Sequence, residues 1–163
     1  MIERITRTYE YDDPNGIAEQ VAEMSGAEMC EAWMRGDGVS PVTATLGYDI
    51  VSYGDGEIEL LCEPGSHQFN PYGIMHGGPI ATLLDTAAGV AVHTTLPKGT
   101  GYTTLDLISH YLRPITLDTG PLTVRGRVTS GGRRVAVSEA EITNADGKKL
   151  ATATSTCLIL AIG

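Results

Sequence analysis

The chain has 163 residues, of which 42% are hydrophobic and 19% are charged, so it is long enough for one domain with a substantial core. Its 11 basic and 20 acidic residues give a net charge of −9. This charge disfavours a nucleic-acid-binding function, because such proteins need a basic face. Only residues 113–163 are basic, with a charge of +3 against −12 for residues 1–112, so the last third could contact an anionic ligand.

The cysteine content and the absence of long apolar segments predict a cytoplasmic protein. Three cysteines, an odd number with no CxxC spacing, do not suit a disulfide framework and favour a reducing compartment. The first residues, MIERITRTYEYDD, lack the apolar stretch of a signal peptide. No apolar run reaches the length of about 18 residues that a membrane span needs. We therefore expect no membrane association.

The first 73 residues are expected to form a helix and then a β-hairpin. Asp13 is a candidate N-cap and Pro14 suits the first turn, so residues 14–35 are predicted to be helical, with Gly26 as a candidate interruption. Residues 43–51 and 57–62 have the composition of strands on either side of Gly-Asp-Gly, a hairpin signal. Residues 64–73 are rich in turn formers and are expected to form a loop.

The remainder is predicted to be one long helix followed by four strands. Apolar residues recur at helical spacing between His76 and Thr94. The expected strands cover residues 102–112, 121–129, 133–143 and 150–160. Gly-Gly and Asp-Gly pairs join the last three, which indicates an antiparallel meander. The predicted order is α-β-β-α-β-β-β-β.

The charge pattern of the long helix indicates that it is enclosed and functional. Asp85 is the only charged residue among the 34 residues from Pro64 to Pro97, whereas a surface helix carries charges on its outer face. A single sheet of five or six strands wrapped along the helix would enclose it nearly all round. Asp85 lies in mid-helix, where aspartate has a poor helix propensity and no capping role, which suggests a role other than folding.

Several motifs occur together at set offsets between residues 70 and 114. They are N-x2-G-x2-HGG-x6-D, running from Asn70 to Asp85, then Thr-Leu-Asp at 104–106 and Tyr-Leu-Arg-Pro at 111–114. This pattern resembles the hotdog-fold acyl-CoA thioesterases of the phenylacetate-degradation (PaaI-like) type. The four predicted strands extend the resemblance to the C-terminus, whereas residues 1–40 match less clearly.

The resemblance implies an α+β protein with the hotdog fold, an antiparallel β-sheet wrapped around a long central α-helix. Residues 41–163 would form this domain, and residues 1–40 an N-terminal helical extension. The family also implies self-association as a dimer or a dimer of dimers, with the active site between two subunits. One chain would contribute Asn70, His76 and Gly77, and the other would contribute Asp85 and Thr104.

The chemistry of thioester hydrolysis assigns the two main roles. The N–H of Gly77, at the start of the helix, lacks an intrahelical partner and can stabilise the oxygen that becomes negative. Gly78 next to it lets the substrate approach without interference from a Cβ atom. Asp85 is either the nucleophile or the general base that activates water, and the sequence leaves both open.

Three further residues have supporting roles. Thr104 matches a family position whose hydroxyl would orient the attacking water, and Thr103 is the alternative. Asn70 either donates its amide to the carbonyl or fixes the loop. His76 is expected to have a catalytic role in positioning the thioester, and the alternative is that it caps the loop.

The CoA part of the substrate needs cationic partners for its phosphates. Arg113, Arg133 and Arg134 are the candidates, because guanidinium groups suit phosphate oxygens. No cofactor is expected, since CoA is part of the substrate. No metal is expected either, because the histidines lack the spacing of metal ligands.

The predicted function is hydrolysis of acyl-CoA or aryl-CoA thioesters to a free acid and CoA. One alternative is a hotdog dehydratase or hydratase, which usually pairs a histidine with a carboxylate at other offsets. The other alternative is a non-catalytic acyl-CoA-binding protein. Such a binder has no use for an enclosed carboxylate beside a thioester, so the pattern favours the enzyme.

Overall fold

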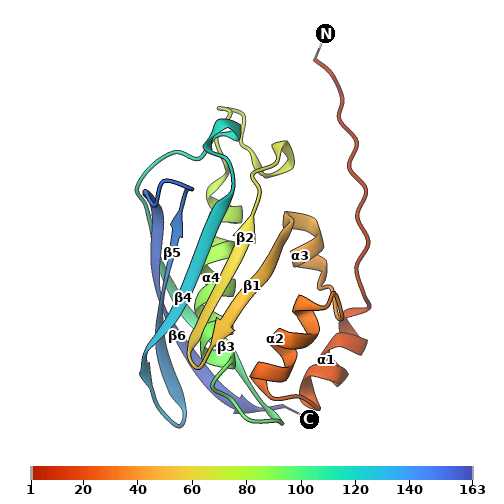
Figure 1. Cartoon of the computed structure of the whole chain (residues 1–163), viewed down its shortest axis with the longest axis vertical. Helices are drawn as coiled ribbons and strands as arrows, with labels where there is room; N and C mark the ends of the chain where they lie inside the picture. Colours follow the sequence, from red (N-terminus) through yellow and green to blue (C-terminus); the bar gives the residue numbers. More distant parts are fainter. Residues whose placement is uncertain (1, 163) are drawn as a thin grey trace.

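The computed structural model describes residues 2–162 and shows one antiparallel sheet curved around a long helix (Figure 1). The sheet has six strands in the order β1-β2-β4-β5-β6-β3, so that β1 and β3 are its edges. The strands are β1 (Tyr48–Gly54), β2 (Glu57–Cys62), β3 (Thr100–Tyr111), β4 (Leu122–Gly131), β5 (Val135–Thr143) and β6 (Lys149–Ala161). The predicted meander of the last three strands and the α+β architecture are confirmed.

The long helix α4 (Gly77–His93) begins and ends where the sequence indicates. The Nδ1 atom of His76 accepts a hydrogen bond from the N–H of Gly78 at 3.2 Å and so caps the helix. Leu83 and Leu84 are fully buried against the concave face of the sheet. At Gly126 on β4, a Cβ atom would lie 2.0 Å from the carbonyl oxygen of Ala87, so this glycine lets helix and strand approach closely.

The N-terminal region forms two helices where the sequence predicted one. These helices are α1 (Pro14–Ala22) and α2 (Gly26–Met34). The predicted helix breaks before Gly26 because Ser25 starts a new helix through a capping box with Glu28. Gly26 packs so tightly on the end of α4 that a Cβ atom would lie 1.7 Å from the carbonyl oxygen of His93.

The strand predicted for residues 43–51 is wrong in its first half. Residues Pro41–Leu46 form the short helix α3, and β1 starts only at Tyr48. Ser40 caps α3 by accepting a hydrogen bond from the N–H of Thr43 at 3.2 Å. Gly47 ends it in the left-handed conformation, with φ of 74°. These start and stop signals outweigh the strand propensity of the β-branched residues between them.

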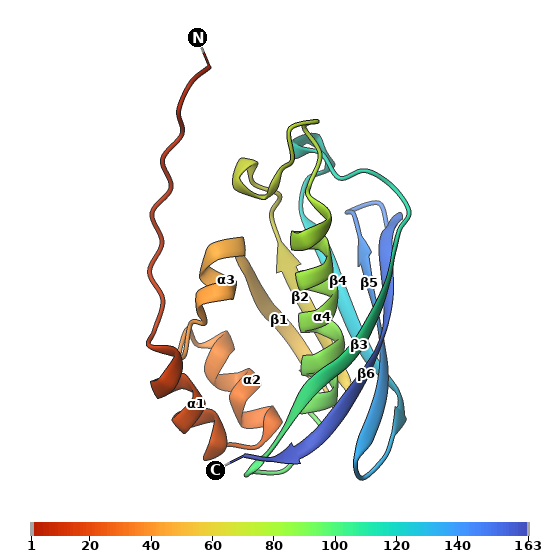
Figure 2. The same cartoon turned by 180° about the vertical axis from the view of Figure 1, so that it is seen from behind.

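The three N-terminal helices lie beside the β1 edge, and the lower ends of α1 and α2 come close to the start of β3 (Figure 2). Trp33 on α2 packs on Tyr48 of β1, with ring centroids 6.2 Å apart. Beyond its first residues, the β3 edge runs away from these helices (Figure 2). Within residues 2–162, no helix has both the length and the apolar character needed to cross a bilayer.

Candidate active site

One face of α4 is left partly uncovered by the chain. Gly78 is exposed and Asp85 is half-buried, whereas residues 87–93 are all buried. The expectation that the helix is enclosed nearly all round therefore holds only for its C-terminal half. The small residues of the uncovered face leave room for a ligand or another chain beside Asp85.

The Asp85 carboxylate is paired with a threonine of the edge strand. The hydroxyl of Thr104 donates a hydrogen bond to Asp85 Oδ1 at 2.9 Å. Thr103 is exposed and, because side chains alternate along a strand, lies on the other side of β3. The geometry thus favours Thr104 over its alternative. No ion pair within residues 2–162 involves Asp85.

Gly77 presents a free amide at the start of α4. Its N–H donates to no acceptor in the described part of the chain, as expected for the first residue of a helix. The Tyr111 hydroxyl donates to the Gly77 carbonyl oxygen at 3.2 Å and holds this turn against β3. The N–H of Gly78, by contrast, is occupied by His76. Of the two glycines, Gly77 is therefore the one whose N–H can donate a hydrogen bond to a substrate oxygen.

Asn70 and His76 both make hydrogen bonds that fix the local backbone. For each residue, this corresponds to the structural alternative and not to a direct contact with the substrate. The Oδ1 atom of Asn70 accepts from the N–H groups of Tyr72 at 2.9 Å and Ile74 at 3.4 Å, so this side chain fixes the loop. The Asn70 amide nitrogen makes no hydrogen bond within residues 2–162 and is free to donate. His76 caps α4 through Nδ1.

Gly77 and Asp85 of one chain lie too far apart to act on the same thioester. They are separated by eight residues of a helix, which rises about 1.5 Å per residue and so spans about 12 Å. An oxyanion donor and a general base must each lie within about 3 Å of neighbouring substrate atoms or of a bound water. Within one protomer, the structure does not bring these two predicted residues together.

The three arginines expected at the CoA phosphates lie at opposite ends of α4. Arg113 lies near the N-terminal end of α4. Tyr111, two residues before Arg113 in the chain, contacts Gly77 at that end of the helix. Arg133 and Arg134 follow β4. The Arg134 carbonyl accepts a hydrogen bond from the N–H of Ile159, which pairs with Tyr102 of β3 near the C-terminal end of α4. All three are exposed. In one protomer they do not form a single phosphate site.

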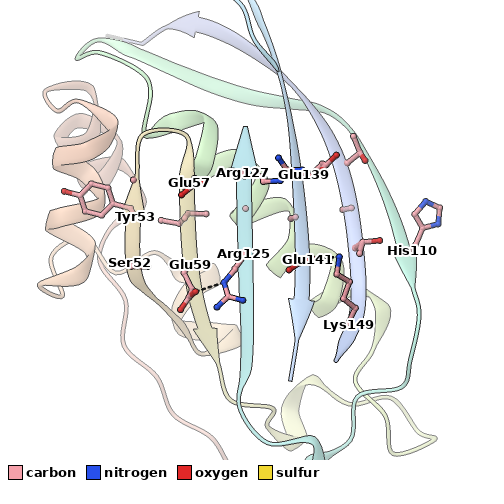
Figure 3. A pocket seen from close by; sticks show the side chains of 17 residues that line it. Ser52, Tyr53, Glu57, Glu59, His110, Arg125, Arg127, Glu139, Glu141 and Lys149 are labelled. Carbon is pink, nitrogen blue, oxygen red and sulfur yellow. Dashed lines mark hydrogen bonds and ion pairs between the residues drawn. The ribbon is translucent and has the colours of Figure 1, made fainter. Parts of the chain in front are cut away.

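A separate hollow lies on the other face of the sheet and does not include Asp85. It has a volume of about 650 Å³, and rows of acidic and basic side chains line it (Figure 3). Arg125 pairs with Glu59 at 2.7 Å and Arg127 with Glu139 at 2.8 Å. These opposite charges compensate one another across neighbouring strands, as in a solvated sheet face. We therefore place the candidate active site at Asp85.

The buried cysteines are core residues, as expected. Cys62 and Cys157 are 1% and 0% exposed. Burial raises the pKa of both thiols, which disfavours the reactive thiolate. No group of three potential metal ligands occurs in the part of the chain that the structure describes.

Sequence reasoning missed two tyrosines of β3 that face α4. Tyr111 holds Gly77, and Tyr102 packs on Gly89 of the same helix. For Tyr102 the signal was present in the sequence. Because residues two apart in a strand share a face, the residue two before Thr104 had to lie on the side of Asp85.

Comparisons with known proteins agree with this architecture. Residues 72–151 match the family described as the thioesterase superfamily. The chain is 28% identical over 103 residues to a Haemophilus influenzae protein with the name of an esterase, covering 63% of this chain and 73% of that protein. A phenylacetic acid degradation-related protein from Ralstonia eutropha has a similar structure, with a TM-score of 0.71 and 33% identity, covering 79% of this chain and 98% of that one.

A third comparison is a hypothetical thioesterase from Streptococcus pneumoniae solved with coenzyme A. It has a TM-score of 0.65 and 29% identity, covering 71% of this chain and 90% of that one. The match to the family begins at Tyr72 and so contains Gly77, Asp85 and Thr104, whereas α1, α2 and α3 lie outside it. These similarities and the six-stranded sheet around α4 confirm that the chain belongs to the thioesterase superfamily, as a hotdog-fold protein of the phenylacetate-degradation type.

Proposed function

We propose that the protein hydrolyses acyl-CoA or aryl-CoA thioesters to a free acid and CoA. The observation that carries this proposal is the Asp85 carboxylate, half-buried on the uncovered face of α4 and hydrogen-bonded to Thr104 at 2.9 Å. Membership of the thioesterase superfamily supports hydrolysis of a thioester. The coenzyme A bound to the Streptococcus pneumoniae protein supports CoA as the thiol part of the substrate.

In the proposed mechanism, Asp85 acts as the general base. The Thr104 hydroxyl donates its hydrogen to Asp85 Oδ1, so its oxygen remains free to accept a hydrogen bond from water. Asp85 then removes a proton from that water while the water oxygen attacks the acyl carbon. As the C–S bond breaks, the proton passes from Asp85 to the departing thiolate. The products are a free acid and CoA.

Two other solved structures of the Streptococcus pneumoniae protein each carry one substitution. One carries an aspartate-to-alanine substitution and the other a threonine-to-alanine substitution. Asp85 and Thr104 are the same two residue types. If Asp85 instead attacked directly, it would form an acyl anhydride. In a single turnover in ¹⁸O-labelled water, attack of water on the aspartyl carbon of this anhydride would place the label in the Asp85 carboxylate, whereas the general-base route places the label only in the free acid.

The oxyanion donor is proposed to come from a second copy of the chain. Since Gly77 and Asp85 of one chain are about 12 Å apart, the amide beside Asp85 must belong to Gly77 of the partner subunit. The free edge strand β3 supports such pairing, because Leu105 and Ile108 on it are 57% and 59% exposed. An antiparallel arrangement of two such strands would form a two-fold dimer with two equivalent sites.

We assign the contact with the CoA phosphates to Arg113, which lies at the exposed end of α4. Arg133 and Arg134, at the other end, are the alternative. Substituting Arg113 by alanine is expected to raise KM for the acyl-CoA more than kcat falls, because a phosphate contact is remote from the reacting bond. A larger effect in the Arg133→Ala, Arg134→Ala double variant would transfer the assignment to those two residues.

The test is release of free thiol from a panel of acyl-CoA and aryl-CoA thioesters. We expect turnover with at least one panel member and a loss of at least about 100-fold in the Asp85→Asn variant. Asp49→Asn, at an exposed position of β1, is the matched control and should keep full activity. Binding of CoA without thiol release from any panel member would favour the non-catalytic binder. Reversible hydration of an enoyl-CoA would favour the hydratase.

A further inference from the structure

The edge strand β3 changes the set of residues that it turns toward α4 in the middle of its length. In its second half, the odd-numbered residues face the helix, since Leu107 packs against the core and Tyr111 contacts the start of α4. The even-numbered His110 lies on the other side and lines the outer hollow (Figure 3). Because side chains alternate along a regular strand, Thr104 would be expected to face outward with His110. It faces α4 instead and donates to Asp85.

A β-bulge accounts for this change of face. Thr104 is paired with Cys157 of β6, whereas Asp106 is paired with the neighbouring residue Thr156. Leu105 is therefore an extra residue without a partner on β6, and one extra residue shifts the alternation of a strand by one position. Without the bulge, the hydroxyl of Thr104 would point away from α4.

Two polar contacts with β6 fix the residue that follows the bulge, Asp106. Its Oδ1 atom accepts a hydrogen bond from the N–H of Thr156 at 3.2 Å. Its backbone carbonyl accepts from the hydroxyl of Ser155, a fully buried residue, at 3.0 Å. No ion pair within residues 2–162 involves the Asp106 carboxylate, so its contact in that range is with the backbone of β6. Aspartate is depleted in regular strands, and here it stabilises an irregular one.

We propose that Asp106 is a positioning residue that acts on the reaction through Thr104. By holding the bulge against β6, it directs the Thr104 hydroxyl to Asp85, so that the pair can hold the attacking water. In this role Asp106 itself contacts neither the substrate nor that water. The inference deepens the proposed thioesterase mechanism and rests on it.

The first experiment compares two substitutions of Asp106 by steady-state thiol release. Asp106→Ala removes the acceptor of the Thr156 N–H and should lower kcat by about 10-fold, the value of one orienting hydrogen bond, with KM within about 2-fold of the wild type. Asp106→Asn keeps an oxygen that can accept this hydrogen bond and should retain kcat within about 3-fold. An equal loss in both variants would overturn the inference, because the charge and not the hydrogen bond would then be needed.

A double variant separates positioning from a general effect on folding or assembly. If Asp106 acts only through the Thr104 hydroxyl, Asp106→Ala should cause no further loss of kcat in a Thr104→Val protein. A further loss of about 10-fold in that background would overturn the inference, because Asp106 would then act independently of Thr104. Asp12→Ala is the matched control. Asp12 also accepts a backbone N–H, that of Val39 at 2.8 Å, but it lies before α1, so kcat should be unchanged.

Crystal structures of the two Asp106 variants measure the position of the threonine directly. The distance from Thr104 Oγ to Asp85 Oδ1 should exceed about 3.5 Å, the limit of a hydrogen bond, in Asp106→Ala. In Asp106→Asn it should stay near the 2.9 Å of the wild type. A distance still near 2.9 Å in Asp106→Ala would overturn the inference while leaving the thioesterase proposal intact. Absence of thiol release by the wild type from every panel member would overturn the proposed function and the inference with it.

Discussion

Thr104 and Asp85 are 19 residues apart in the sequence, yet the threonine hydroxyl donates to Asp85 Oδ1 at 2.9 Å. The contact joins the edge strand β3 to the middle of α4 on the face that one chain leaves uncovered. Because the threonine donates its only hydrogen to the carboxylate, its oxygen can accept from a water molecule. The pair can therefore hold and activate one water.

Thr104→Val should lower kcat by about 10-fold, since it removes one orienting hydrogen bond and preserves the shape of the side chain. The measurement is steady-state thiol release with the best substrate of the panel. Thr104→Ser retains the hydroxyl and should stay within about 3-fold of the wild type. Full activity of Thr104→Val together with a loss in Thr104→Ser would show that the methyl group, and not the hydroxyl, is needed.

Gly77→Pro should reduce kcat by about 100-fold or more, because it removes the proposed oxyanion donor. Proline is tolerated at the first position of a helix, and His76 before it has ψ of 147°, as a residue preceding proline requires. Gly77→Ala is the matched control. It keeps the N–H, and its Cβ atom would lie 3.6 Å from the Tyr111 hydroxyl, an ordinary contact. Activity of the proline variant equal to that of the alanine variant would remove Gly77 from the mechanism.

His93 should make the protein less stable in mild acid. The side chain is 6% exposed, its Nε2 atom has no partner, and burial lowers its pKa. The unfolded chain then binds the proton more readily than the folded one, so stability is full above a pH of about 6.5 and falls below it. The loss is at most about 1.4 kcal/mol per pH unit for one proton.

The measurement for His93 is the midpoint of urea unfolding between pH 7.5 and pH 5, two values that bracket the ordinary histidine pKa of about 6.5. His93→Leu should show a smaller decrease over this range than the wild type. His110→Gln, at an exposed position on β3, should show the same decrease as the wild type. An unchanged slope in His93→Leu would mean that other groups cause the acid dependence.

Gly26→Ala should destabilise the protein by about 1–3 kcal/mol, the range for inserting a methyl group into a close-packed contact. The new Cβ atom would lie 1.7 Å from the carbonyl oxygen of His93, so α2 must move away from the end of α4. Gly16→Ala in α1 is the control, because its nearest neighbour would be Asp13 Oδ2 at 3.9 Å. The control should be neutral or slightly stabilising in the same unfolding experiment.

The sequence predicted the central helix and the strands of the second half well because their signals are local. The spacing of the apolar residues, together with the Gly-Gly and Asp-Gly pairs between strands, predicts β4, β5 and β6 within a few residues of their observed bounds. The error at residues 43–46 arose because β-branched residues favour a strand, whereas the actual signals were the cap at Ser40 and the left-handed Gly47. Such caps are short and easily missed.

The candidate site was only partly predictable, because its geometry depends on contacts distant in sequence. The motif located Asp85 and Gly77 but not the Tyr102 ring on Gly89, which arises from the register of β3 against α4. The expectation that α4 is enclosed all round considered one chain alone, without a partner subunit. The structure leaves the Asp85 face open, and the proposed dimer accounts for that open face.

The most direct test of the central claim, that two subunits share each active site, is complementation between two inactive chains. Asp85→Asn and Gly77→Pro chains are purified separately, unfolded together and refolded as a mixture. In a mixed dimer, the intact Asp85 of one chain faces the intact Gly77 of the other, so random pairing should restore activity to about a quarter of the wild-type level. Activity of the refolded mixture no higher than that of the two variants refolded alone would contradict a shared site.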